Sequence, residues 1–204
     1  MGLSQIKLSP YSGHFQSWIL PAVLAALCLL GLVFGEPIRE QLRWERSAVA
    51  AGEFYRLVSG HFVHLGVGHT LLNAFGLGLV WLLVGGAFSM LGWIAVLGIV
   101  IAVIDLGFWF WMPSLGWYVG LSGVLHGLLV AGLVGSLRVR RRESLILGAV
   151  IAAKLGYETF VGPLPGSAEA AGGAVIVEAH LYGAVGGLLG GILLSIRGGR
   201  RVTD

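Results

Sequence analysis

Six long apolar runs, separated by shorter polar segments, dominate the chain. They predict helices at about residues 17–35, 67–88, 91–112, 121–137, 144–161 and 178–196. Several of these runs are shorter than the roughly 20 residues that span a bilayer comfortably. A short helix is tolerated in a membrane where neighbouring protein covers its ends, so the pattern predicts a closely packed bundle.

Composition indicates which solvent surrounds this bundle. Hydrophobic residues make up 56% of the 204 residues and charged residues only 11%, whereas a soluble domain carries about 25% charged residues. The 34 glycines suit membrane helices, which approach one another closely through small residues. We therefore expect an all-α polytopic membrane protein, a bundle of six transmembrane helices that forms a single domain over residues 1–204.

The basic residues lie at the ends of apolar runs and form no continuous face, so the net charge of +3 indicates orientation in a membrane and no nucleic-acid partner. Lys and Arg are enriched in cytoplasmic segments. The segments that we expect on that side carry Lys7, Arg138, Arg140, Arg141, Arg142, Arg197, Arg200 and Arg201. The first outer loop carries Arg39, Arg43, Arg46 and Arg56. Both termini are therefore expected to be cytoplasmic.

This orientation brings four polar side chains to one depth, just below the outer surface. They are His69, Asn73, Ser122 and His180, and they lie near the outer ends of three helices. Polar groups are costly in membrane helices, so their convergence indicates a functional site.

Ser122 and His180 are candidates for nucleophile and general base. Ser122 opens a helix whose unpaired N–H groups can stabilise an oxyanion, and Gly120 and Gly123 leave room for a close approach. A serine that only caps the helix is the alternative for Ser122. A buried histidine that holds two helices together is the alternative for His180.

The other polar residues near the site also have two interpretations. His69 and Asn73 can complete an oxyanion hole or cap loop backbone. His126 follows Ser122 by four residues and shares its helix face; we expect its ring to stack on that of His180, and a second base is the alternative. No carboxylate is placed by the sequence to orient a histidine.

We expect no metal and no cofactor. The histidines near residue 65 lack the His-x-x-x-His spacing of a zinc-binding helix, and the single cysteine, Cys28, excludes a thiolate site.

Two further features concern the helices near the C-terminus. Gly183 and Gly187 recur at the spacing that lets membrane helices pack tightly, and packing against the helix of Gly123 would press His180 onto Ser122. Lys154 and Glu158 either neutralise each other inside an apolar helix or form part of a gate that contacts substrate.

Three motifs, in this order, resemble the rhomboid intramembrane serine proteases. They are "EFYRLVSGHFVHLGVGHTLLN" at 53–73, "GLSG" at 120–123 and "AHLYG" at 179–183. The resemblance covers roughly residues 50–195, and the string "GLSGVLHG" is similar to the rhombosortase branch.

The resemblance implies roles for individual residues. Ser122 would be the nucleophile and His180 the general base and acid. The implied oxyanion hole consists of His69, Asn73 and the Ser122 backbone N–H. Two residues would brace the first outer loop, Arg56 and His64. The chain departs from the usual pattern where His126 replaces a tyrosine and where Tyr55 replaces the tryptophan of a Trp-Arg pair.

The implied substrate is a transmembrane protein of the bacterial inner membrane with a C-terminal Gly-Gly-containing sorting tail. Helix-breaking glycines lower the cost of unwinding by about 1 kcal/mol each relative to alanine. Cleavage would occur near the outer, periplasmic boundary, followed by transfer of the acyl group to water or to an amine such as that of a membrane lipid. The alternative is a non-catalytic rhomboid-like protein that binds membrane helices.

Overall fold

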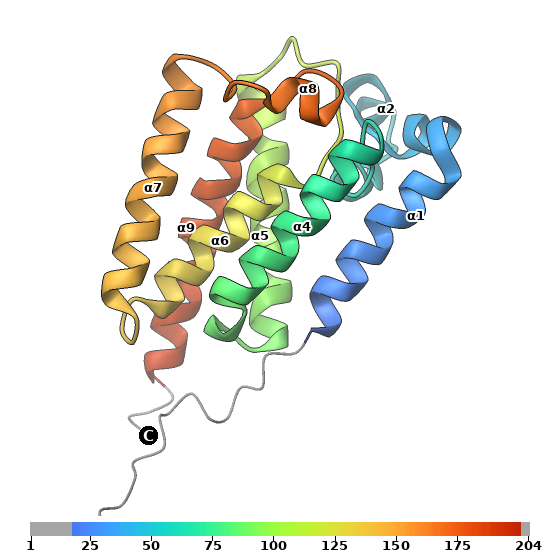
Figure 1. The fold of residues 1–204 in the computed structure, drawn as a ribbon. Coiled ribbons are helices and arrows are strands. Elements are labelled where there is room, and N and C mark those ends of the chain that lie inside the picture. The colour runs from blue at the N-terminus through green and yellow to red at the C-terminus, as the bar shows by residue number, and fades with distance from the viewer. Residues whose placement is uncertain (1–17, 201–204) are drawn as a thin grey trace, which may run out of the picture.

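Six long helices form the bundle in the computed structural model, which describes residues 18–200, with side chains up to residue 196. They are α1 (Ile19–Leu42), α4 (Val67–Val84), α5 (Met90–Trp111), α6 (Ser122–Ser136), α7 (Arg141–Phe160) and α9 (Val177–Arg200) (Figure 1). The shorter elements are β1 (Trp44–Glu45), α2 (Arg46–Ala50), α3 (Arg56–Ser59), the 3-10 turn η1 (Gly85–Ala87), β2 (Trp117–Tyr118) and α8 (Ser167–Ala171). The predicted all-α class is confirmed.

The first helix differs from its predicted range of 17–35. Residue 17, like Lys7 and Arg201, lies outside the described residues. Gly35 adopts φ +70° and ψ −155°, a conformation that is essentially restricted to glycine. Pro37 follows, and its fixed φ suits the first turn of a new helical segment, which ends at Leu42. The predicted boundary is therefore a kink between two helical segments.

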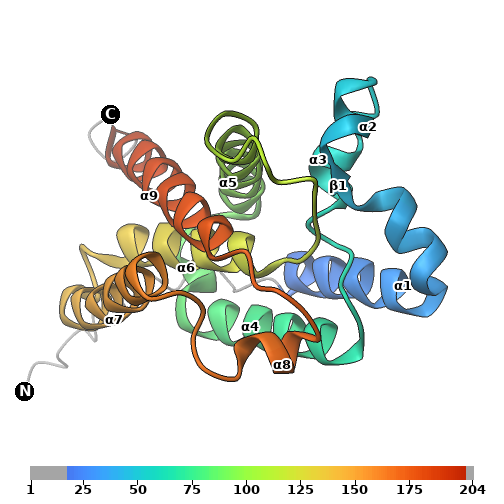
Figure 2. The ribbon, with the colours of Figure 1, turned by 90° about the horizontal axis from the view of Figure 1, so that it is seen from above.

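Within residues 18–200, four helices are long and apolar enough to cross a membrane: α1, α4 with η1, α5 and α9. The fifth apolar helix, α6, has only 15 residues. It contacts α4, α5, α7 and α9 and lies between them when the bundle is viewed from the end that carries α8 (Figure 2). Because protein surrounds α6, a short helix satisfies its backbone there without spanning the full bilayer.

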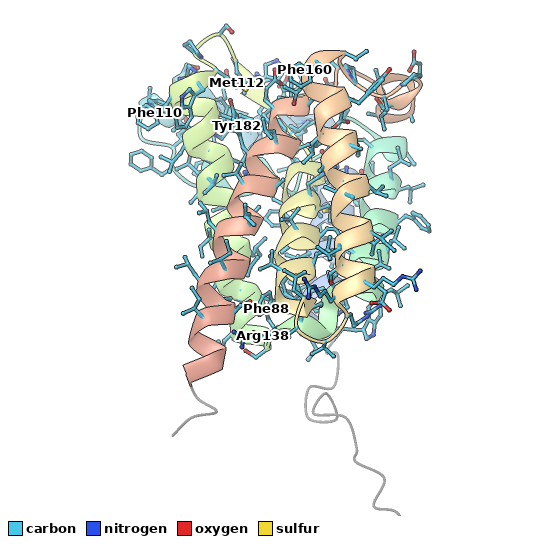
Figure 3. The ribbon with its side chains drawn as sticks, turned by 90° about the vertical axis from the view of Figure 1, so that its left-hand side faces the viewer. Phe88, Phe110, Met112, Arg138, Phe160 and Tyr182 are labelled. Carbon is cyan, nitrogen blue, oxygen red and sulfur yellow. The ribbon has the colours of Figure 1, made fainter. Side chains whose placement is uncertain are left out.

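The two ends of the bundle can be told apart by the residues that lie there. Met112 and Phe160 mark the end near α8, whereas Phe88 and Arg138 lie at the opposite end (Figure 3). The arginines that we expect to be cytoplasmic between α6 and α7 therefore lie away from α8. Arg140 donates a hydrogen bond to the Leu83 carbonyl at 3.1 Å, which links this connection to the end of α4.

Glycines bring α6 and α9 into direct backbone contact. A Cβ atom built on Gly183 or Gly187 would overlap the carbonyl oxygen of Gly123 or Gly127. One turn further, a Cβ on Gly191 would lie 3.0 Å from the Ala131 backbone. The glycine spacing predicted tight packing on a neighbouring helix, and the structure shows that this neighbour is α6. This contact fixes the position of His180 relative to Ser122.

We predict that Gly187→Ala destabilises the protein by about 1–3 kcal/mol, because the new methyl group overpacks the contact with α6. Gly98→Ala is the matched control, since nothing lies within 4 Å of a Cβ at that helical glycine and alanine favours the helix. Thermal unfolding in detergent measures both. Equal stability of the two variants would contradict the assigned contact.

Candidate active site

Ser122 is the first residue of α6, and its hydroxyl points at α9. Its Oγ lies 3.0 Å from Nε2 of His180. The residue at the N-cap is Leu121, and no side chain caps this helix. The alternative in which Ser122 only caps the helix therefore does not fit the structure. The backbone N–H of Ser122 belongs to the first turn of the helix, where N–H groups have no intrahelical partner.

The turn before Ser122 requires glycine. Gly120 has φ +124°, and a Cβ there would lie 2.8 Å from Cε1 of His69. The Tyr118 hydroxyl donates to the Gly120 carbonyl at 2.7 Å, and the Gly120 N–H donates to the Gly60 carbonyl at 3.1 Å. These bonds hold the turn that presents Ser122. Tyr118 was not predicted as a site residue, because its contact with Gly120 exists only in the folded loop.

His180 lies between two partners. Its Nδ1 is 2.9 Å from Oε2 of Glu158, and its side chain is only 7% exposed. A carboxylate accepts hydrogen bonds and donates none, so Nδ1 carries the hydrogen and Nε2 faces Ser122 with a lone pair. This tautomer is the one that accepts the proton of a serine hydroxyl.

The expectation that no carboxylate orients a histidine is wrong, because Glu158 contacts His180. Glu158 is 4% exposed and lies in the last turns of α7, beside the first turn of α9. Lys154 donates to the same Oε2 atom at 2.7 Å. The pair was visible in the sequence as two charges inside an apolar helix. Its direction toward His180 depends on how α7 packs on α9, which no local pattern encodes.

His126 lies against His180. The two rings stack with their centroids 4.3 Å apart and an interplanar angle of 20°. Nδ1 of His126 donates to the Ser122 carbonyl at 2.8 Å, which fixes the ring on the face of α6 that carries Ser122. This is the stacked arrangement that the sequence analysis favoured over a second base.

His69 and Asn73 approach Ser122 from α4. Nδ1 of His69 accepts from the Leu65 N–H at 3.4 Å, so its Nε2 carries the hydrogen. That Nε2 lies 2.9 Å from the ideal Cβ position of Gly120 and thus faces the turn before Ser122. Asn73 is buried and donates to the His69 carbonyl at 3.0 Å. Both residues border the same cavity as Ser122.

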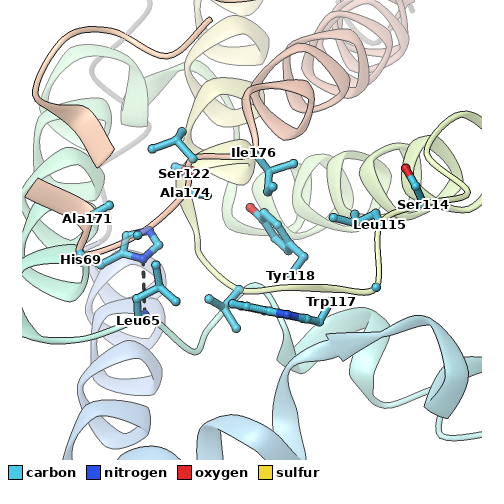
Figure 4. A pocket seen from close by; sticks show the side chains of 15 residues that line it. Leu65, His69, Ser114, Leu115, Trp117, Tyr118, Ser122, Ala171, Ala174 and Ile176 are labelled. Atoms are coloured by element: carbon cyan, nitrogen blue, oxygen red, sulfur yellow. Dashed lines mark hydrogen bonds between the residues drawn. The ribbon is translucent and has the colours of Figure 1, made fainter. Parts of the chain in front are cut away.

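Two cavities meet at Ser122. One, of about 480 Å³, lies between the loop that carries β2 and the segment after α8 (Figure 4). Tyr118 and Ile176 face each other across it, and His69 and Ser122 border it. The other, of about 250 Å³, lies toward α7 and is bordered by Lys154 and Glu158. A peptide therefore has space on two sides of the hydroxyl.

The two predicted bracing residues occupy different places. Arg56 is 8% exposed and donates to the carbonyls of Glu40 and Arg43 and to the carboxylate of Glu53, so it organises the first outer loop and does not contact Ser122. His64 lies closer to the site: its Nε2 accepts from the Leu121 N–H at 3.4 Å, and its ring lies edge-on to His69.

Three of these groups are close enough together to consider as metal ligands. Among the described residues, His126, Glu158 and His180 have ligand atoms within 4.8 Å of one another. Both ring nitrogens of His180 already have hydrogen-bond partners, and Oε2 of Glu158 accepts from Lys154 as well as from His180. Nδ1 of His126 is likewise engaged, by the Ser122 carbonyl. The arrangement suits a hydrogen-bonded network better than a metal ion.

We predict that His64 makes stability depend on pH. Burial, with a smaller contribution from His69, lowers the pKa of His64 to about 3, against roughly 6.5 in the unfolded chain. Between these values the unfolded state binds more protons, so the free energy of unfolding falls as pH decreases from about 6.5 toward 3. His64→Gln should reduce this slope by up to about 1.4 kcal/mol per pH unit, measured by unfolding in detergent. An unchanged slope would contradict the assignment.

Comparison with known proteins identifies the family of the chain. A family model described as Rhomboid domain matches residues 51–197, whereas none of the curated proteins compared with the chain matches it. The matched range covers more than half of the chain and includes His69, Ser122 and His180. On this match, the chain belongs to the rhomboid family.

Proposed function

We propose that the chain is an intramembrane serine endopeptidase, a single membrane domain with Ser122 as nucleophile and His180 as general base. Membership in the rhomboid family supports a protease-like function on transmembrane substrates. The observation that carries the proposal is the 3.0 Å contact between Ser122 Oγ and His180 Nε2 beside two cavities. A protein that only binds helices does not need this contact.

The reaction follows from the partners of each group. Ser122 Oγ attacks the scissile carbonyl carbon while its proton moves to His180 Nε2. The carbonyl oxygen becomes an oxyanion, for which the Ser122 N–H, His69 Nε2–H and the second amide hydrogen of Asn73 are the donors. His180 then gives the proton to the leaving amine nitrogen, and an acyl-enzyme remains. Water, or an amine such as that of a membrane lipid, releases the acyl group.

Several residues support the site by holding other groups in place and take no part in making or breaking bonds. Gly120 and Gly123 keep the turn and α9 close to Ser122. His126 stacks on the imidazole of His180 and limits its rotation. His64 holds the Leu121 N–H, one residue before the nucleophile, and Arg56 holds the outer loop.

The proposed substrate is an exported protein with a Gly-Gly-containing tail ahead of its C-terminal apolar helix. A peptide bond must leave its helix to reach Ser122, and glycines lower the cost of that step. The similarity of "GLSGVLHG" to the rhombosortase branch supports this class. The proposed location is the bacterial inner membrane, with both termini cytoplasmic. The site would then open to the periplasm, since the arginines after α6 lie at the opposite end.

Cleavage in proteoliposomes tests the proposal. The substrate is a single-span protein with a Gly-Gly tail, and a Leu-Leu version of it tests the glycine requirement. We expect Ser122→Ala and His180→Ala each to reduce kcat by at least about 10⁴-fold, as loss of either member of such a pair does. Ser47→Ala, an exposed serine on α2, should cleave like wild type.

The outcomes separate the candidate functions. Cleavage by Ser122→Ala at the wild-type rate would contradict the mechanism. Binding of the substrate by wild type without any cleavage would favour the helix-binding alternative. Equal rates on the Gly-Gly and Leu-Leu substrates would contradict the proposed substrate class but not the protease.

A further inference from the structure

The last turns of α7 place a buried ion pair behind His180, on the side away from Ser122. Glu158 Oε2 accepts from His180 Nδ1 at 2.9 Å and from Lys154 Nζ at 2.7 Å. The Glu158 side chain is 4% exposed and that of Lys154 is 25% exposed. The four residues thus form one chain of contacts, Lys154–Glu158–His180–Ser122.

A gate that contacts substrate does not fit this geometry. A gating carboxylate needs an accessible oxygen, whereas Glu158 is almost fully buried and its Oε2 already has two donors. Mutual neutralisation of Lys154 and Glu158 accounts for one of these bonds only. The bond to His180 is the observation that neither interpretation from the sequence explains.

A buried carboxylate is retained at such a position only when its partners offset the cost of desolvation. Lys154 supplies a counter-charge that persists throughout the reaction, while His180 acquires a charge only after it accepts a proton. The pair Lys154–Glu158 therefore keeps a negative group beside His180 without leaving a net charge inside the helix bundle.

We infer that Glu158 is a positioning residue for the Ser122–His180 pair and extends it to a three-residue unit; this inference rests on the proposed protease function. Glu158 holds the Nδ1 hydrogen of His180, which leaves the Nε2 lone pair directed at Ser122 Oγ. When the serine proton moves to Nε2, Glu158 stabilises the imidazolium that forms. The Nδ1 hydrogen stays on His180, and the Nε2 hydrogen passes to the leaving amine nitrogen, so Glu158 neither gains nor loses a proton.

Kinetics on the single-span substrate test this role. We expect Glu158→Gln to reduce kcat by up to about 10⁴-fold, the loss seen when the orienting carboxylate of a serine protease is neutralised. KM should change little, because the Glu158 side chain is only 4% exposed and its Oε2 is directed at His180 and Lys154. Glu158→Asp keeps the carboxylate but moves it one methylene away from His180. It should recover part of the kcat that Glu158→Gln loses. Glu178→Gln is the matched control, an exposed carboxylate two residues before His180, and should behave as wild type.

A second variant guards against a simple folding defect. Glu158→Gln leaves Lys154 without its partner, whereas Glu158→Gln combined with Lys154→Gln removes both charges and keeps the net charge unchanged. We expect the double variant to unfold near the wild-type temperature and still to show the loss in kcat. A wild-type kcat in a folded double variant, or a raised KM with unchanged kcat in Glu158→Gln, would overturn the inference. Cleavage by Ser122→Ala would instead remove the proposed function itself.

Discussion

The close contact between α6 and α9 is the constraint on which the rest of the structure depends. Carbonyl oxygens of Gly123 and Gly127 occupy the space that a side chain at Gly183 or Gly187 would fill. No hydrophobic force draws helices together in a lipid environment, so such contacts depend on van der Waals packing and on backbone proximity. Because α9 lies this close to α6, His180 reaches Ser122 from the neighbouring helix.

Five residues at this end of the bundle form one connected set of polar contacts: Lys154, Glu158, His180, Ser122 and His126. His126 is fixed by the Ser122 carbonyl, His180 by Glu158, and Glu158 by Lys154. Burying such a network costs little free energy only while every member has a hydrogen-bond partner. The site lies at the end of the bundle, where loops and cavities admit a peptide, while α6 itself is surrounded by protein.

The sequence predicted much of this arrangement because its main signals are local. Apolar runs located the long helices, and short motifs pointed to Ser122, His180 and the stacking of His126. Glu158 and its neighbour Lys154 were visible as charges in an apolar helix. The contact of Glu158 with His180 was not, because it depends on how α7 packs on α9. The kink at Gly35 and the role of Tyr118 likewise depend on the folded path of the outer loop. The roles of the site residues in catalysis remain predictions.

The central claim is that His180 activates Ser122. It is tested most directly by mapping, with mass spectrometry, where a fluorophosphonate probe attaches to the detergent-solubilised protein. The account predicts one adduct, on Ser122, that disappears when His180 is replaced by alanine. An adduct on another residue, or undiminished labelling of Ser122 without His180, would contradict it.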